Sequence, residues 1–136
     1  MMYLFDTDTL SNVLRKEPSP ALLVRLASVP LENQFTTTIT VGEMVYGAHR
    51  STRRDDLLRQ FDERLWPTMR ILTFDRGAAE TYGVLRAELE RSGTPLAEPD
   101  LRIGAIALSH HLTVVTGNVR HFSRIPGLDV ENWINP

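Results

Sequence analysis

Carboxylate side chains recur in this sequence where predicted strands end or where the next helix begins. In chain order they are Asp6, Asp8, Glu43, Asp75 and Asp100. Carboxylates brought to one place repel one another, and such a group either holds a proton or recruits a cation. Oxygen ligands in a chain without cysteine favour the hard ions Mg²⁺ and Mn²⁺. These ions polarise a phosphoryl oxygen and activate water, so the pattern points to metal-assisted cleavage of a phosphate ester.

Each carboxylate also has a purely structural interpretation. We expect Thr7 or Asp8 to cap the first helix, which leaves Asp6 at its strand end with less structural reason to be there. Thr40–Glu43 matches a capping box, in which the glutamate returns to the amide of the cap residue. Asp75 is interpreted as an N-cap. Asp100 begins a strongly apolar helix, and it is interpreted as either a helix cap or a metal ligand.

Strand and helix patterns alternate along the chain. Predicted strands are Met2–Phe5, Gln34–Ile39, Arg70–Phe74, Leu112–Val115 and a short one at Leu128–Val130. Predicted helices run from Thr9 to about Lys16 and over Ala21–Ala27, Thr40–His49, Arg53–Leu65, Arg76–Arg91 and Asp100–His111, with loops at Thr94–Pro99 and Gly117–Ser123. Helical crossovers permit parallel pairing, so we predict an α/β sheet with helices on both faces. Ligands of such sheets bind beyond the carboxyl ends of the strands, where the acids lie.

The four histidines do not suggest a metal site. His110 and His111 are adjacent, so on a helix their side chains diverge by about 100° and cannot face one ion together. His49 and His121 are isolated, and we expect both on the surface.

Length and composition bound the class of protein. The chain has 136 residues and a mass of 15.4 kDa, with 42% hydrophobic and 24% charged residues, which indicates one folded domain over 1–136. No apolar stretch reaches the ~18 residues that span a bilayer, and the first residues lack a signal-peptide pattern. We therefore expect a cytoplasmic protein. The net charge of −2 does not by itself indicate a polyanionic partner, although every basic residue except Lys16 is arginine.

Four blocks of sequence stand out in a fixed order: Phe5–Ser11, Gly42–Gly47, Pro99–Ala107 and Val115–Phe122. Together they resemble the PIN-domain family, and most closely its VapC-type toxin branch. The closing segments, Arg124–Leu128 and Glu131–Trp133, also fit this branch. The similarity covers essentially the whole chain, and the ordered set is far more specific than any single block.

The resemblance implies a three-layer α/β/α PIN-like domain with a mainly parallel central sheet, and a ribonuclease that depends on Mg²⁺ or Mn²⁺. By motif position, Asp6 and Asp100 are the main metal ligands. Glu43 completes the cluster, either as a ligand through water or as the group that orients the attacking water.

Three further positions follow from the same resemblance. Ser11 matches a small polar position near the site, and Thr116 matches the threonine after the fourth strand. The family often has a fourth acid in the last loop, where this chain has Asn118. A neutral amide orients a ligand or water without adding charge, so we expect one tightly held ion and a second recruited by the substrate phosphate.

Partners are implied in the same way. Members of this branch pair with a small VapB-type antitoxin, form homodimers, and cut structured RNA such as tRNA. Arg102 and Arg120 are candidates to hold phosphate oxygens, since guanidinium groups bind them well, and both are also interpretable as solvated surface residues.

Other functions compete with the nuclease hypothesis. Asp6–Thr9 matches the Asp-x-Asp-x-Thr signature of haloacid-dehalogenase-like phosphatases, but Lys16 and Asp55–Asp56 are badly placed to complete that site. A receiver-like phospho-signalling domain lacks a suitable lysine and has only Asp75 near the required position. A catalytically weak PIN-like module that binds RNA or a partner is supported mainly by Asn118.

Overall fold

Five short parallel strands form the centre of the molecule. The computed structural model describes residues 1–136, and its strands are β1 (Tyr3–Phe5), β2 (Gln34–Thr37), β3 (Arg70–Leu72), β4 (Thr113–Val115) and β5 (Val130–Glu131). Their order across the sheet is β3-β2-β1-β4-β5, and every neighbouring pair is parallel. The carboxyl ends of all five strands therefore lie along one edge, as the alternation of strands and helices predicts.

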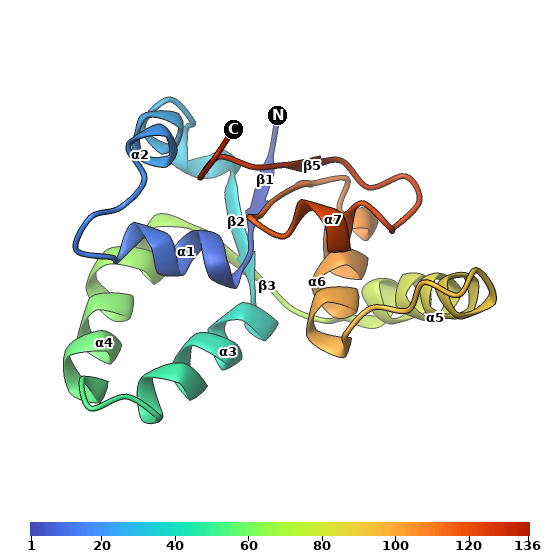
Figure 1. Ribbon diagram of the computed structural model, residues 1–136, viewed down its shortest axis with the longest axis horizontal. Helices are drawn as coiled ribbons and strands as arrows, with labels where there is room; N and C mark the ends of the chain where they lie inside the picture. The colour runs from blue at the N-terminus through green and yellow to red at the C-terminus, as the bar shows by residue number, and fades with distance from the viewer.

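Seven helices cover the sheet on its two faces. They are α1 (Thr7–Val13), α2 (Pro20–Ala27), α3 (Thr38–His49), α4 (Arg54–Gln60), α5 (Arg76–Arg91), α6 (Glu98–Ser109) and α7 (Val119–Phe122). Figure 1 shows α1 to α4 on one side of the sheet and α5 to α7 on the other. The predicted α/β/α layering is confirmed. None of these helices is both long enough and apolar enough to cross a membrane.

The alternation of side chains along β1 divides the interior into two cores. Successive residues of a strand point to opposite faces. Leu4 lies in the core under α5 and α6, with Leu85 and Ile106 among its members. Tyr3 and Phe5 lie in the core under the N-terminal helices. Apolar burial thus fixes both helical layers against β1, the middle strand of the sheet, and holds the strand end that carries Asp6.

Several element boundaries differ from the prediction. The strands are shorter than expected, since β2 ends at Thr37 and β3 at Leu72, while β5 is shifted toward the C-terminus to Val130–Glu131. Helix α6 begins at Glu98 rather than Asp100, and Pro99 is accommodated because the first helical turn needs no amide hydrogen from it. The predicted loop Gly117–Ser123 contains the short helix α7.

Other helix ends also differ. Helix α1 stops at Val13, before Lys16. The predicted helix Arg53–Leu65 is interrupted: α4 ends at Gln60, and Phe61–Leu65 forms a wider π-helical turn. Phe61 and Leu65 are both buried in the core beneath the N-terminal helices, so the apolar periodicity correctly predicted their burial but not the change of helix type.

Candidate active site

A hollow of about 340 Å³ opens at the carboxyl edge of the sheet. Its wall contains four carboxylates from three parts of the chain, together with polar and apolar neighbours: Asp6, Thr7, Asp8, Ser11, Arg15, Glu43, Asp100, Ile103 and Asn118. We call it the acidic pocket. The three acids predicted as the catalytic cluster therefore line one hollow.

Asp6 is the deepest of these carboxylates. It follows β1 directly, is only 5% exposed, and caps α1 by accepting a hydrogen bond from the Thr9 amide at 3.2 Å. The expectation that Thr7 or Asp8 would be the cap is therefore wrong. The buried Thr116 hydroxyl donates to the other carboxylate oxygen of Asp6. Burial, and then the neighbouring Asp8 carboxylate, raise the pKa of Asp6 well above its ordinary value despite these two hydrogen bonds.

Asp8 is a pocket residue rather than a cap. The Gly117 amide donates to Asp8 Oδ2 at 2.9 Å, so this carboxylate ties α1 to the loop after β4. A Cβ atom at position 117 would come within 2.5 Å of Asp8 Oδ2, which explains why glycine stands there. Sequence reasoning placed Asp8 among the acids at the strand ends and as a possible cap, but not among the predicted metal ligands. The signal that identifies it is its two-residue spacing from Asp6 across the strand-to-helix turn.

Glu43 does not form the predicted capping box. Thr37 is the N-cap of α3 and accepts a hydrogen bond from the Thr40 amide at 3.1 Å, so the helix starts two residues earlier than expected. Because Glu43 then lies in the second turn, its carboxylate is free of the helix end. Instead the Thr7 hydroxyl donates to Glu43 Oε1 at 2.7 Å. This hydrogen bond fixes the carboxylate on the side of α3 that faces α1.

Asp100 lies in the first turn of α6, with its side chain 25% exposed. Its Oδ2 atom lies 3.7 Å from His121 Nδ1. Partial burial raises the pKa of Asp100, as do the charges of Glu43 and Asp8, and His121 acts in the opposite direction. His121, expected to be an isolated surface residue, is therefore in contact with the site.

The loop after β4 closes the pocket. Thr116 is fully buried, and its hydroxyl accepts from the Asn118 amide at 2.8 Å while it donates to Asp6. Asn118 lines the pocket, as does the exposed Ser11 on α1. All three residues thus lie where the resemblance implied, and their roles in orienting substrate, water or metal remain predictions.

The basic residues of the region are arranged differently from the prediction. Arg102 Nε binds Glu98 at 3.2 Å, with the guanidinium stacked over Phe74 and Tyr82, and it does not line the pocket. Arg120 is an exposed residue of α7 that also stays outside the pocket lining. Arg15 does line it. Sequence reasoning missed Arg15, although it follows Ser11 by four residues, the spacing that places side chains on one helix face.

The chemistry of this pocket suits a hard cation. All its donors are oxygens apart from the side-chain nitrogens of Arg15 and Asn118, and no arginine or lysine forms a salt bridge with any of the four carboxylates. Asp6 lies beside Asp8, Asp100 lies beside Glu43, and neither pair of carboxyl groups has a full counter-charge. The carboxylates surround the hollow and do not converge on one point, since no three of them stand close enough together to hold an ion. A cation bound here therefore needs small side-chain movements or bridging water, as Mg²⁺ commonly does.

Comparison with known proteins assigns the family. The family profile of the PIN domain matches residues 3–128. The chain belongs to the PIN-domain family. It lies in the VapC-type toxin branch: it is 33% identical to the tRNA(fMet)-specific endonuclease VapC of Salmonella typhimurium over 98% of both chains, and 31% identical to ribonuclease VapC2 of Rickettsia felis over the same shares. The VapBC2 complex of R. felis, solved bound to a promoter DNA fragment, contains a chain that superposes with a TM-score of 0.90 at 30% identity, covering 98% of this chain and 99% of that one.

A groove extends from the acidic pocket of this PIN domain between α1, α3 and α4. Its volume is about 430 Å³, and it shares Thr7, Ser11, Arg15 and Glu43 with the pocket. The floor of the groove is apolar and is formed by Leu14, Met44, Ala48, Leu57 and Phe61. Arg53 makes the rim farthest from the pocket basic. The acidic pocket and this groove are therefore adjoining hollows.

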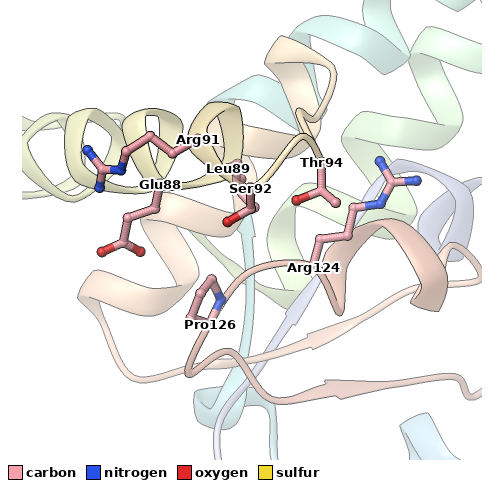
Figure 2. Close-up of a pocket in the computed structure, with 7 residues that line it drawn as sticks. All are labelled: Glu88, Leu89, Arg91, Ser92, Thr94, Arg124 and Pro126. Carbon is pink, nitrogen blue, oxygen red and sulfur yellow. The ribbon is translucent and has the colours of Figure 1, made fainter.

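A larger hollow, of about 500 Å³, lies elsewhere in this PIN domain, between the end of α5 and the segment after α7 (Figure 2). Its only carboxylate is Glu88, and Figure 2 shows Arg91 and Glu88 directed outward from α5. Arg124 lines one end of the hollow and donates to the Pro95 carbonyl at 3.1 Å. Because this hollow gathers no group of carboxylates, its size does not make it the catalytic site.

Proposed function

We propose that this protein is a divalent-cation-dependent endoribonuclease, the toxin of a VapBC-type toxin–antitoxin pair that acts in the cytoplasm. The observation that carries the proposal is the acidic pocket: four carboxylates from three distant parts of the chain line one hollow at the carboxyl edge of a VapC-type PIN fold. The relatives named as ribonuclease and tRNA-specific endonuclease support RNA as the substrate.

Asp6 and Asp100 are the residues proposed to hold Mg²⁺ or Mn²⁺. Both line the pocket, Asp6 from the strand end before α1 and Asp100 from the first turn of α6. Burial, and then the neighbouring carboxylates, raise the pKa of both groups, and a bound cation would favour their ionised forms. When bound, the cation polarises a phosphoryl oxygen and lowers the pKa of coordinated water.

Glu43 is proposed to orient and deprotonate the attacking water. Thr7 occupies one of its carboxylate oxygens, and the other is free to accept a hydrogen bond from water. A carboxylate held in one orientation places the water with less loss of entropy than a freely rotating one. Thr116 and Asn118 support the same geometry, because their hydrogen bond fixes the loop beside Asp6.

The substrate phosphates need basic contacts near the cation. Arg15 lines the pocket and is the nearest candidate, while Arg102 and Arg120 remain candidates for phosphates farther along the RNA. Ser11, beside the pocket, offers a hydroxyl to a phosphate or sugar oxygen. We infer a structured RNA such as tRNA as the substrate class, because the Salmonella relative is named for tRNA(fMet).

A VapB-type antitoxin is the proposed partner, and a homodimer the proposed assembly. The related structures are VapBC complexes, which supports the pairing. The groove between α1, α3 and α4 leads into the acidic pocket and has an apolar floor, so a segment of antitoxin lying in it would also block RNA. Light scattering on the purified chain, expected to give twice 15.4 kDa, tests the dimer.

Cleavage of RNA by purified variants tests the activity. Asp6→Asn and Asp100→Asn should abolish Mg²⁺-dependent cleavage of tRNA while the circular dichroism spectrum is unchanged, and a chelator should abolish cleavage by the unmodified protein. Asp62→Asn is the matched control, since Asp62 is an exposed acid outside the pocket. Undiminished cleavage by either pocket variant contradicts the proposed mechanism.

Expression in cells separates the enzyme from a PIN-like module that only binds RNA or a partner, the alternative that the neutral Asn118 favours. The unmodified protein should arrest growth when produced without its antitoxin, and Asp6→Asn should relieve the arrest. Equal growth of cells that produce either form would favour the binding module.

A further inference from the structure

We propose that Asp8 is a further functional carboxylate of the acidic pocket, whose negative charge strengthens binding of the divalent cation where Asn118 contributes none. The inference rests on the proposed function, because it concerns the same cation. Asp8 and Asn118 line the same hollow, from the first turn of α1 and from the loop after β4.

The hydrogen bonds of Asp8 show which of its atoms is available. Oδ2 accepts from the Gly117 amide at 2.9 Å, which fixes the direction of the side chain. Oδ1 lies 3.5 Å from Thr116 Oγ1, and that hydroxyl has one proton, which it donates to Asp6 Oδ2. The other oxygen of Asp8 therefore has the Asp6 carboxyl group as its neighbour, and only a proton held between the two groups or a bound cation can satisfy it.

The loop after β4 and the Asp8 carboxylate are in close contact at Gly117. Any side chain at position 117 would meet Asp8 Oδ2, so the loop and the carboxylate are fitted to one another. A structural link to the Gly117 amide needs only an acceptor, which asparagine or serine also provides. The negative charge of aspartate also raises the pKa of the Asp6 and Asp100 carboxyl groups, and a cation in the pocket would offset this repulsion.

Asp8→Asn separates the two roles. The asparagine carbonyl can still accept from the Gly117 amide, and its NH₂ group can donate to Thr116 Oγ1, so the loop keeps its hydrogen bonds. We expect Mn²⁺ affinity, measured by titration with electron paramagnetic resonance on metal-free protein, to fall roughly 10- to 100-fold, the usual cost of losing a supporting group beside a metal. The melting temperature of the metal-free protein should stay the same or rise.

Asp8→Asn/Asn118→Asp moves the charge across the pocket and should recover at least part of the lost Mn²⁺ affinity. Asp62→Asn, which removes an equal charge elsewhere, should bind Mn²⁺ like the unmodified protein. Asp8→Ser is a second uncharged variant, used if Asp8→Asn does not fold. It should lose affinity to a similar degree.

The outcomes distinguish this inference from the proposed function. Failure of the unmodified protein to bind Mn²⁺ would overturn both. Tight Mn²⁺ binding by the unmodified protein and equally tight binding by Asp8→Asn would overturn only the role of Asp8 and leave it a structural link to Gly117. If Asp8→Asn loses Mn²⁺ affinity and the double variant does not recover it, the identity of residue 8 determines the affinity. That result would overturn the claim that negative charge in the pocket strengthens Mn²⁺ binding.

Discussion

The buried carboxyl of Asp6 should make the stability of the metal-free protein depend on pH in an unusual direction. Burial and the neighbouring Asp8 raise its pKa from 3.8 to about 9. Between these values the folded protein holds a proton that the unfolded chain has released. Stability is therefore greatest at low pH and falls as pH rises through this range, the reverse of the behaviour of a salt-bridged aspartate.

The size of the effect follows from linkage. While the folded state holds one proton more than the unfolded state, each pH unit lowers the free energy of unfolding by about 1.4 kcal/mol. From pH 5 to pH 8 the loss attributable to Asp6 is therefore at most about 4 kcal/mol, a large share of the 5–15 kcal/mol typical of a domain. Asp6→Asn removes the titrating group, and its amide can still accept from Thr9 and donate to Thr116.

Urea denaturation in the presence of a chelator, at several pH values between 5 and 8, measures this difference. The free energy of unfolding of the unmodified protein should fall relative to that of Asp6→Asn as the pH rises, and saturating Mg²⁺ at pH 8 should restore it only in the unmodified protein. A difference between the two proteins that does not change with pH would show that Asp6 is already ionised at pH 5, and would refute the reasoning.

Two threonines give further predictions. Thr7→Val removes the donor to Glu43 and should lower kcat roughly tenfold with little change in KM, measured on RNA cleavage, since one hydrogen bond to a charged group is lost. Thr7→Ser keeps the hydroxyl and should retain most of the activity, and an equal loss in both variants would contradict the role of the hydroxyl. Thr116→Val leaves Asp6 Oδ2 and the Asn118 amide without their partner, so the free energy of unfolding should fall by about 1–3 kcal/mol in urea titrations. Thr116→Ser is the control, and a destabilisation as large as that of Thr116→Val would contradict this account.

The sequence contains enough information to predict the layers and the edge that carries the site. Alternating strands and helices predict a parallel sheet, and acids after the strands predict a pocket at its carboxyl edge. Both expectations depend on patterns among residues that are close in the sequence, and in the folded protein the contacts between distant elements agree with these patterns. Asp6, Glu43 and Asp100 were predictable as pocket residues for that reason.

The detailed partners of these residues were not predictable, because they are set by contacts distant in the chain. Thr40–Glu43 has the spacing of a capping box, yet Thr37 supplies a cap from the preceding strand and the Thr7 hydroxyl engages Glu43 from another helix. Asp8 has the local signature of a cap, yet the Gly117 amide, 109 residues away, determines its role. Local propensity is a weak prior that such contacts override.

The strand order has a consequence for how the molecule is made. β1 lies between β2 and β4, so the first strand synthesised has only one neighbour until Thr113–Val115 has been translated. Asp100 also comes late in the chain. So does the loop after β4, in which Thr116 and Gly117 donate hydrogen bonds to Asp6 and Asp8. A nascent chain emerging from the ribosome therefore has neither its full sheet nor its complete set of carboxylates until the segment that contains α6, β4 and β5 has been translated.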